Sequence, residues 1–127
     1  MFNMTGIVAV KEATMFSKAR PWWMILEVDW SIMEYYRYWI AKQGEKTCPP
    51  LAKCHVSMVR GEEPRDKNYW QQVLGKKLKI TYTNDLQTNG KHWWLPVTSP
   101  DILQVREKLG LKPPKFQLHL TVATKAQ

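Results

Sequence analysis

The amino-acid sequence predicts an α+β domain in which two similar strand and helix lobes, residues 1–75 and 76–127, face each other across a central cleft. Two observations lead to this fold class. Short apolar and β-branched runs with period-two alternation are interspersed with segments of helical periodicity. Each half also follows approximately the order strand, strand, helix, strand, and each last strand follows a helix and a Pro-Pro connection. We expect a single domain over residues 1–127, in which the lobes can exchange strands.

The composition is that of a globular protein with a basic surface. The chain has 127 residues, 44% hydrophobic and 24% charged, so it is long enough to bury a core without disulfides or metal ions. Nineteen Lys and Arg against eleven Asp and Glu give a formal charge of +8, which favours a polyanionic partner such as nucleic acid, a nucleotide or an anionic membrane. A basic surface that serves only solubility is an equally good interpretation of the charge alone.

The cysteines and the hydropathy pattern indicate a cytoplasmic location. Cys48 and Cys54 flank a Pro-Pro turn without the spacing of a zinc site, and with no signal peptide in view they are expected to be reduced thiols. No apolar run approaches the length of a membrane span. We therefore expect a protein of the cytoplasm, or of the host cytoplasm if the chain is viral, with no membrane partner and no obligate protein partner.

The first half contains three expected strands and two expected helices. Ser31 is the predicted N-cap of the first helix, Glu34 completes a capping box, and Gly44 ends the helix. Pro49-Pro50 imposes an irregular connection. The expected elements are a strand over 5–10, a loop over 11–21, a strand over 22–28, a helix from residue 31, a connection over 47–53, a strand over 55–60 and a short helix over 64–74.

The second half repeats this theme. Ser99 is the predicted N-cap of a helix with Pro100 at its first position, and Gly110 follows its end. The expected elements are a strand over 77–83, a hairpin connection over 84–90, a strand over 91–98, this helix, and a last strand over 116–123.

Two of the expected strands place a histidine and a hydroxyl together on one face. In the last strand, alternation places His119 and Thr121 on the face opposite the apolar residues. In the strand over 55–60 it does the same for His55 and Ser57. With 13 Ser and Thr in 127 residues, a hydroxyl follows a histidine at this spacing about one time in ten by composition. Because two of the three histidines have such a partner, we favour a shared functional role for the two pairs. The alternative is that each pair simply lies on the solvated face of its strand. The apolar faces comprise Leu118, Leu120 and Val122, and Cys54, Val56 and Met58.

Two histidines and two hydroxyls suit the metal-free cleavage of a phosphodiester. Imidazole has an ordinary pKa of about 6.5, so near neutral pH one ring can accept a proton while the other donates one. Hydroxyl groups can donate hydrogen bonds to the non-bridging phosphate oxygens as charge develops. We therefore assign His55, Ser57, His119 and Thr121 as candidate catalytic residues, with no metal and no cofactor; which histidine is the acid stays open.

Other chemistries are weaker interpretations of the same residues. His55 and His119 with His92 suggest a zinc site, but no carboxylate lies at ligand spacing from either motif and a hydroxyl is a poor zinc ligand. A Ser-His-Asp hydrolase lacks a nucleophile-elbow sequence, and Ser57 shares the face of its own histidine. The main alternative from another class is a non-catalytic basic domain that binds RNA or nucleotides.

The paired motifs His55-Val-Ser57 and His119-Leu-Thr121 resemble those of the 2H phosphoesterase (LigT-like) superfamily. The resemblance implies a bilobal α+β fold and metal-independent cleavage of nucleotide phosphodiesters, with the two histidines catalytic and the two hydroxyls holding the phosphate. The first motif has Ser where many members have Thr, which preserves the hydroxyl.

Within that superfamily, the small size, the strand near the N-terminus and the abundance of tryptophan look most similar to phage anti-CBASS proteins. These proteins degrade the cyclic oligonucleotide signals of bacterial immunity, so the resemblance implies a cyclic di- or trinucleotide, or a short RNA-type phosphodiester, as substrate. Members that act on RNA ends, on 2′,5′-linked oligonucleotides or on 2′,3′-cyclic phosphates remain open.

Several residues outside the motifs are candidate substrate contacts. Lys53 lies two positions before His55, where its ammonium can attract phosphate. Of Trp93 and Trp94, alternation sends one to the core and leaves the other as a platform for a base. Trp22 and Trp23 pose the same choice, and the core is favoured for them. Arg60 and Arg65 can extend the positive rim, but surface charge is the favoured interpretation of each.

Overall fold

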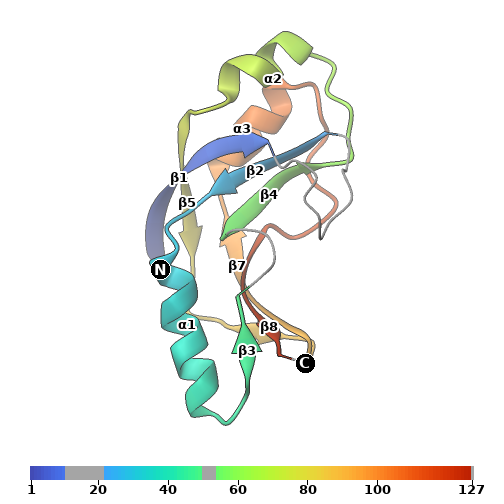
Figure 1. Cartoon of the computed structure of the whole chain (residues 1–127). Helices are drawn as coiled ribbons and strands as arrows, with labels where there is room; N and C mark the ends of the chain where they lie inside the picture. Colours follow the sequence, from blue (N-terminus) through green and yellow to red (C-terminus); the bar gives the residue numbers. More distant parts are fainter. Residues whose placement is uncertain (11–21, 50–53, 127) are drawn as a thin grey trace.

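The computed structural model describes residues 1–10, 22–49 and 54–126 and confirms a mixed α+β chain. Figure 1 shows the helices at the two ends of a strongly twisted sheet. The predicted loop over 11–21 lies outside the described residues. The elements are β1 (Phe2–Val10), β2 (Trp23–Glu27), α1 (Ser31–Lys42), β3 (Thr47–Cys48), β4 (His55–Arg60), α2 (Lys67–Val73), β5 (Lys77–Tyr82), β6 (Gln87–Thr88), β7 (His92–Thr98), α3 (Pro100–Lys108) and β8 (His119–Lys125).

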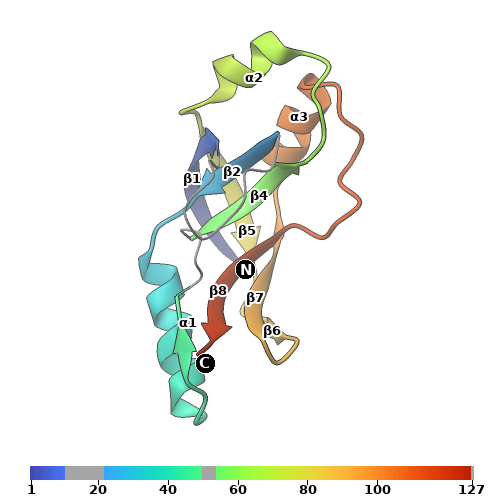
Figure 2. The same ribbon diagram turned by 45° about the vertical axis from the view of Figure 1, so that its right-hand side comes forward.

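All of these strands belong to one antiparallel sheet that closes on itself. Its order is β3-β8-β4-β2-β1-β5-β7-β6, and β8 also pairs with β7. The ring β8-β4-β2-β1-β5-β7 is therefore a six-stranded barrel, with β3 and β6 attached outside it (Figure 2). The two predicted lobes are thus joined through shared strand pairs, since β5 pairs with β1 and β8 pairs with β4.

The pairing is uneven around the barrel. β1 and β5 are in register over six pairs and β7 and β8 over five, whereas β4 and β8 are joined at the single pair Val56 and Leu120. The two motif strands therefore meet at one point and diverge on either side of it.

The motif strands present the faces that alternation predicts. On β4 and β8 the apolar residues join a core cluster that also takes side chains from α1, α2 and α3. The motif histidines and hydroxyls are partly exposed on the opposite face. The buried residues of the two strands include Val56, Met58, Leu120 and Val122.

The helix α1 begins one residue earlier than predicted. Its N-cap is Trp30, and Ser31 is the first helical residue. The Asp29 carboxylate accepts the Ser31 backbone N–H at 2.8 Å, and this hydrogen bond lowers the pKa of Asp29. Glu34 accepts from the Trp30 indole N–H at 2.6 Å instead of forming the capping box. The prediction of Ser31 as N-cap is wrong because Asp29 already supplies the oxygen that satisfies the first N–H.

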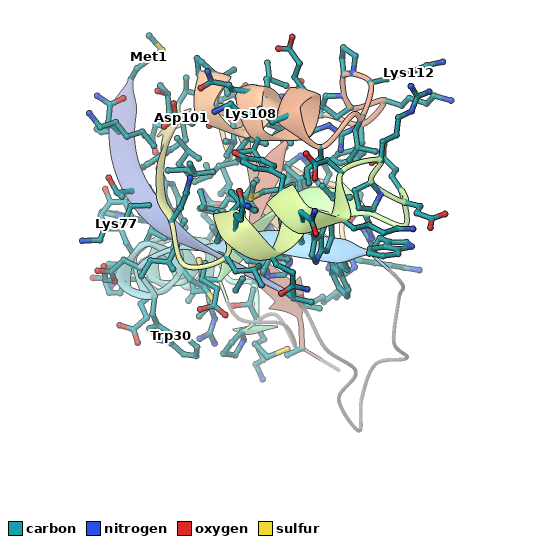
Figure 3. The ribbon with its side chains drawn as sticks, turned by 90° about the horizontal axis from the view of Figure 1, so that it is seen from above. Met1, Trp30, Lys77, Asp101, Lys108 and Lys112 are labelled. Carbon is teal, nitrogen blue, oxygen red and sulfur yellow. The ribbon has the colours of Figure 1, made fainter. Side chains whose placement is uncertain are left out.

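The helix α3 begins as predicted. The Ser99 hydroxyl accepts the Ile102 N–H at 3.1 Å and donates to the Lys79 carbonyl at 2.6 Å, which fixes the helix to β5. The shorter helix α2 has Asp66 as N-cap and lies beside α3, because the Asp66 N–H donates to the Leu109 carbonyl at 3.3 Å. Figure 3 looks down on these two helices.

A buried arginine on α3 ties together the segments around the motif strands. Arg106 is 1% exposed and donates to the Met58 carbonyl on β4 at 2.9 Å and to the Lys112 carbonyl, ahead of β8, at 2.7 Å. It also forms a bidentate ion pair with Glu62, with bonds of 2.9 and 2.8 Å. The helix therefore holds the end of one motif strand and the approach to the other.

Three segments predicted as irregular or extended differ from expectation. Thr47–Cys48, within the predicted connection, forms β3 against β8, and Gln87–Thr88, within the predicted hairpin connection, forms β6. The last strand begins at His119, since at Gln117 the side-chain amide donates to the Val97 carbonyl at 3.1 Å. Within the described ranges no helix is long and apolar enough to cross a membrane.

Candidate active site

The four candidate catalytic residues line one cavity of about 670 Å³. They come from β4 and β8, which also contribute Arg60 and Thr124, and the rest of the lining comes from β2, β7 and the segments before β7 and β8. The lining comprises Trp23, His55, Ser57, Arg60, Asn89, His92, Trp94, Phe116, Gln117, His119, Thr121 and Thr124.

The strand register explains why both motifs reach this cavity. Val56 and Leu120 face each other across β4 and β8. In an antiparallel pair the next residue of one strand lies beside the preceding residue of the other. Ser57 is therefore on the side of His119, and His55 is on the side of Thr121. Both motifs point to the same side of the sheet and line the same cavity, so they form one surface.

A backbone carbonyl fixes the orientation of His119. Its Nδ1 lies 3.0 Å from the Gln117 carbonyl oxygen, and a carbonyl only accepts, so the proton is on Nδ1. Nε2 is then left as the nitrogen that can accept or transfer a proton. The Trp94 ring lies edge-on to His119, with centroids 6.5 Å apart at 66°. The second motif is thus oriented before any substrate arrives.

Trp23 organises the first motif. Its indole N–H donates to Ser57 Oγ at 3.0 Å, which leaves the Ser57 hydroxyl hydrogen to be donated to another acceptor. The same indole lies edge-on to His55, with centroids 6.0 Å apart at 75°, and the Arg60 guanidinium lies over it at 5.2 Å. One side chain therefore contacts the histidine, the hydroxyl and a cation of the site.

The cysteine before the first motif takes no part in this surface. Cys54 is 2% exposed on the core side of the chain, and burial raises the pKa of its thiol to about 12. A thiol that keeps its proton near neutral pH is a poor nucleophile.

In each tryptophan pair one ring lines the cavity and the other packs in or against the core. Trp94 lines the cavity, whereas Trp93 is 7% exposed in the core, so Trp93 is corrected from candidate base contact to core residue. Trp23 was assigned to the core and instead lines the cavity, while Trp22 packs against the core. Lys53 lies outside the described residues.

Arg60, interpreted from the sequence as surface charge, and Gln117, for which the sequence predicted no role, also line the cavity. Arg60 is opposite Trp23 in the register of β2 and β4, so correct pairing of those strands identifies both. Arg65, the other arginine considered, is absent from the cavity lining, and its backbone N–H donates to the Leu109 carbonyl at 2.9 Å.

The three histidines share the cavity without the neighbours of a metal centre. His92 Nδ1 is 3.4 Å from the Thr124 hydroxyl. Among the residues that the structure describes, no three His, Cys, Asp or Glu side chains are close enough together to hold a metal ion. The groups that the cavity brings together are imidazoles, hydroxyls, amides and a guanidinium.

A second cavity of about 680 Å³ lies between β1, α1 and the end of β5, and none of its lining residues is a histidine. There the Tyr36 hydroxyl donates to Asn84 at 2.6 Å, and burial raises the pKa of Tyr36. A phenol that holds its proton this firmly is not a base near neutral pH. The three imidazoles, whose ordinary pKa is nearest to neutral pH, line the cavity of the motif strands instead.

The chain matched no protein-family model, no curated protein and no solved structure in the three comparisons made. Membership of the 2H phosphoesterase superfamily therefore stays a prediction from the two motifs. The geometry of the cavity is what supports a function for them.

Proposed function

We propose that the chain is a metal-independent phosphodiesterase of the 2H type that cleaves 3′,5′ bonds in cyclic oligonucleotide immune signals, as phage anti-CBASS enzymes do. The observation that carries the proposal is that His55 with Ser57 and His119 with Thr121 flank the single pair between β4 and β8 and line one cavity. The proposal includes the bilobal 2H arrangement, with each lobe contributing one motif strand, and a site of action in the cytoplasm.

The chemistry follows from placing a phosphodiester between the two imidazoles. One histidine accepts the proton of the ribose 2′-hydroxyl, whose oxygen attacks phosphorus, and the other donates a proton to the departing 5′-oxygen. The 5′ bond breaks as the 2′ bond forms, which gives a 2′,3′-cyclic phosphate. The same pair can then open this product with water. Attack by a neighbouring hydroxyl is favoured because the nucleophile is already held beside phosphorus.

The hydroxyls and the surrounding residues suit this reaction. The Ser57 hydroxyl accepts from Trp23 and so has its own hydrogen to donate to a non-bridging oxygen, where negative charge develops. Arg60 lines the same cavity, and the chain has a formal charge of +8, both of which favour an anionic substrate. Trp94 supplies a ring for a base.

We expect hydrolysis of a cyclic dinucleotide or trinucleotide to persist in excess EDTA, since the proposed proton transfers use only imidazoles and hydroxyls. The test incubates the purified protein with cyclic dinucleotides, cyclic trinucleotides, 2′,3′-cyclic mononucleotides, 2′,5′-linked oligonucleotides and RNA ends, and follows products by mass spectrometry. Complete loss in EDTA that zinc or manganese restores would overturn the acid–base scheme. Binding of nucleotides with no hydrolysis of any of them would support the non-catalytic alternative.

We also expect a 2′-deoxy or 2′-O-methyl analogue of the preferred substrate to bind without being cleaved, because it lacks the attacking hydroxyl. The measurement compares rates and dissociation constants at matched concentrations, with mass spectrometry to detect the 2′,3′-cyclic phosphate from the ribose form. Cleavage of the deoxy analogue at a comparable rate would show that water attacks directly, and the histidine roles would then be reassigned.

A further inference from the structure

The cavity extends beyond the catalytic residues to a second group of polar side chains. Along β7 and β8, Trp94 is opposite Thr121 and His92 is opposite Thr124. The register shifts between Trp93 and Trp94, so the three positions from Thr121 to Thr124 correspond to two positions of β7, about 7 Å along the strand. His92, Thr124 and Asn89 therefore line the same cavity at a distance where they contact a different part of a bound substrate.

These three residues leave two hydrogen-bond donors for a ligand, one from the His92–Thr124 pair in either tautomer of His92 and one from the Asn89 amide. His92 Nδ1 is 3.4 Å from the Thr124 hydroxyl, so Nε2 is the ring nitrogen left for a ligand. The Asn89 side-chain oxygen accepts from the backbone N–H groups of Lys91 and His92, both at 2.9 Å. The remaining end of the Asn89 side chain is its amide nitrogen, which is only a donor.

The charge of the chain favours an anion in this cavity, because the formal charge is +8. Among the described residues that line the cavity, none is Asp or Glu. Two hydrogen-bond donors in a lining without a described carboxylate suit the oxygens of a phosphate.

We propose that His92, Thr124 and Asn89 bind a second phosphate group of the substrate, one that is not cleaved while the first lies between His55 and His119. The inference rests on the proposed function and narrows it, because it requires a substrate with at least two phosphates. A cyclic dinucleotide meets this requirement and a 2′,3′-cyclic mononucleotide does not.

The test compares His92→Ala and Thr124→Val on three substrates. They are a 3′,5′-cyclic dinucleotide, a linear dinucleoside monophosphate, and the same dinucleoside with an added 5′- or 3′-terminal phosphate. We expect each variant to raise KM on the order of tenfold for the cyclic dinucleotide and for at least one terminally phosphorylated form, with kcat unchanged. KM for the dinucleoside monophosphate, which has two bases and one phosphate, should not change.

Two controls separate this effect from a structural one. Thr98→Val alters an exposed threonine at the other end of β7, outside the cavity, and should leave all three KM values unchanged. Thr124→Ser keeps the hydroxyl and should restore the wild-type KM. Thermal unfolding identifies any variant that is not folded.

Equal increases in KM for the dinucleoside monophosphate would show that the group recognises a nucleoside, and unchanged KM values throughout would show no subsite; either result overturns the inference. If the wild-type protein cleaves none of the three substrates, the proposed function fails. The second phosphate site is then judged by dissociation constants for the same ligands, where the same dependence on the second phosphate is expected.

Discussion

Replacing either His55 or His119 by alanine should lower kcat by about 100-fold or more while the protein stays folded, because each variant loses one arm of the proton transfer. Both side chains are on the partly exposed face of their strands, so their removal opens no cavity in the core. The measurements are kcat on the preferred substrate and the thermal unfolding midpoint of each variant. A histidine variant that retains a rate near that of the wild type would place the active site elsewhere.

The hydroxyl variants provide a graded comparison. Ser57→Ala and Thr121→Ala each remove one hydrogen bond to a charged phosphate, which is worth about 1.5–3 kcal/mol. We therefore expect their rates to lie between those of the histidine variants and the wild type. Thr98→Val, outside the cavity, is again the matched control and should retain the wild-type rate.

Replacing Arg106 by methionine should lower the free energy of unfolding by about 2–4 kcal/mol, because buried carbonyls that lose their donor cost about 1–3 kcal/mol each. The variant leaves the Met58 and Lys112 carbonyls without the donor that they have in the native chain. Urea unfolding followed by tryptophan fluorescence measures the loss. Lys108→Met is the matched control: it removes an exposed cation from the same helix, labelled in Figure 3, and should change stability by no more than about 0.5 kcal/mol.

The pH dependence gives this prediction a second readout. The hydrogen bond from Arg106 is the main cause that lowers the pKa of Glu62 in the folded chain. A lowered pKa stabilises the fold above the ordinary pKa of glutamate, and this stabilisation disappears as the pH falls through the lowered value. Its size is reduced by solvent, since the Glu62 side chain is 36% exposed. Arg106→Met should lose this part of the acid dependence. An unchanged unfolding midpoint at neutral pH would show that Arg106 is not the anchor its contacts indicate.

The sequence was informative where alternation was strict. Over residues 55–58 and 119–122 the polar and apolar residues alternate strictly, so the face of each histidine was predicted correctly. Around Trp22 and Trp23 the apolar run is continuous, so alternation does not show which of the two side chains points to the core. The position of Trp23 in the cavity follows from its pairing with Arg60 across β2 and β4, which is a tertiary contact.

Other features depend on groups that are far apart in the chain. Arg106 occurs among apolar residues of a regular helix, and its role requires Glu62 and Met58 to arrive at the same place. The N-cap of α1 is Trp30 and not Ser31, because the Asp29 carboxylate accepts the Ser31 N–H. The capping-box pattern in the sequence does not include Asp29. That both motifs share a cavity also follows from the closure of the barrel, which no local pattern encodes.

The single contact between the motif strands has a consequence for how the protein is made. Val56 and Leu120 lie 64 positions apart, and β8 follows every other strand in the chain. Closing so long a loop costs more entropy than forming the local β1–β2 pair, and distant pairings of this kind slow folding. A nascent chain that already contains β1, β2, β4 and β5 has one histidine and one hydroxyl of the four. The complete set exists only after β8 has emerged from the ribosome and docked between β4 and β7.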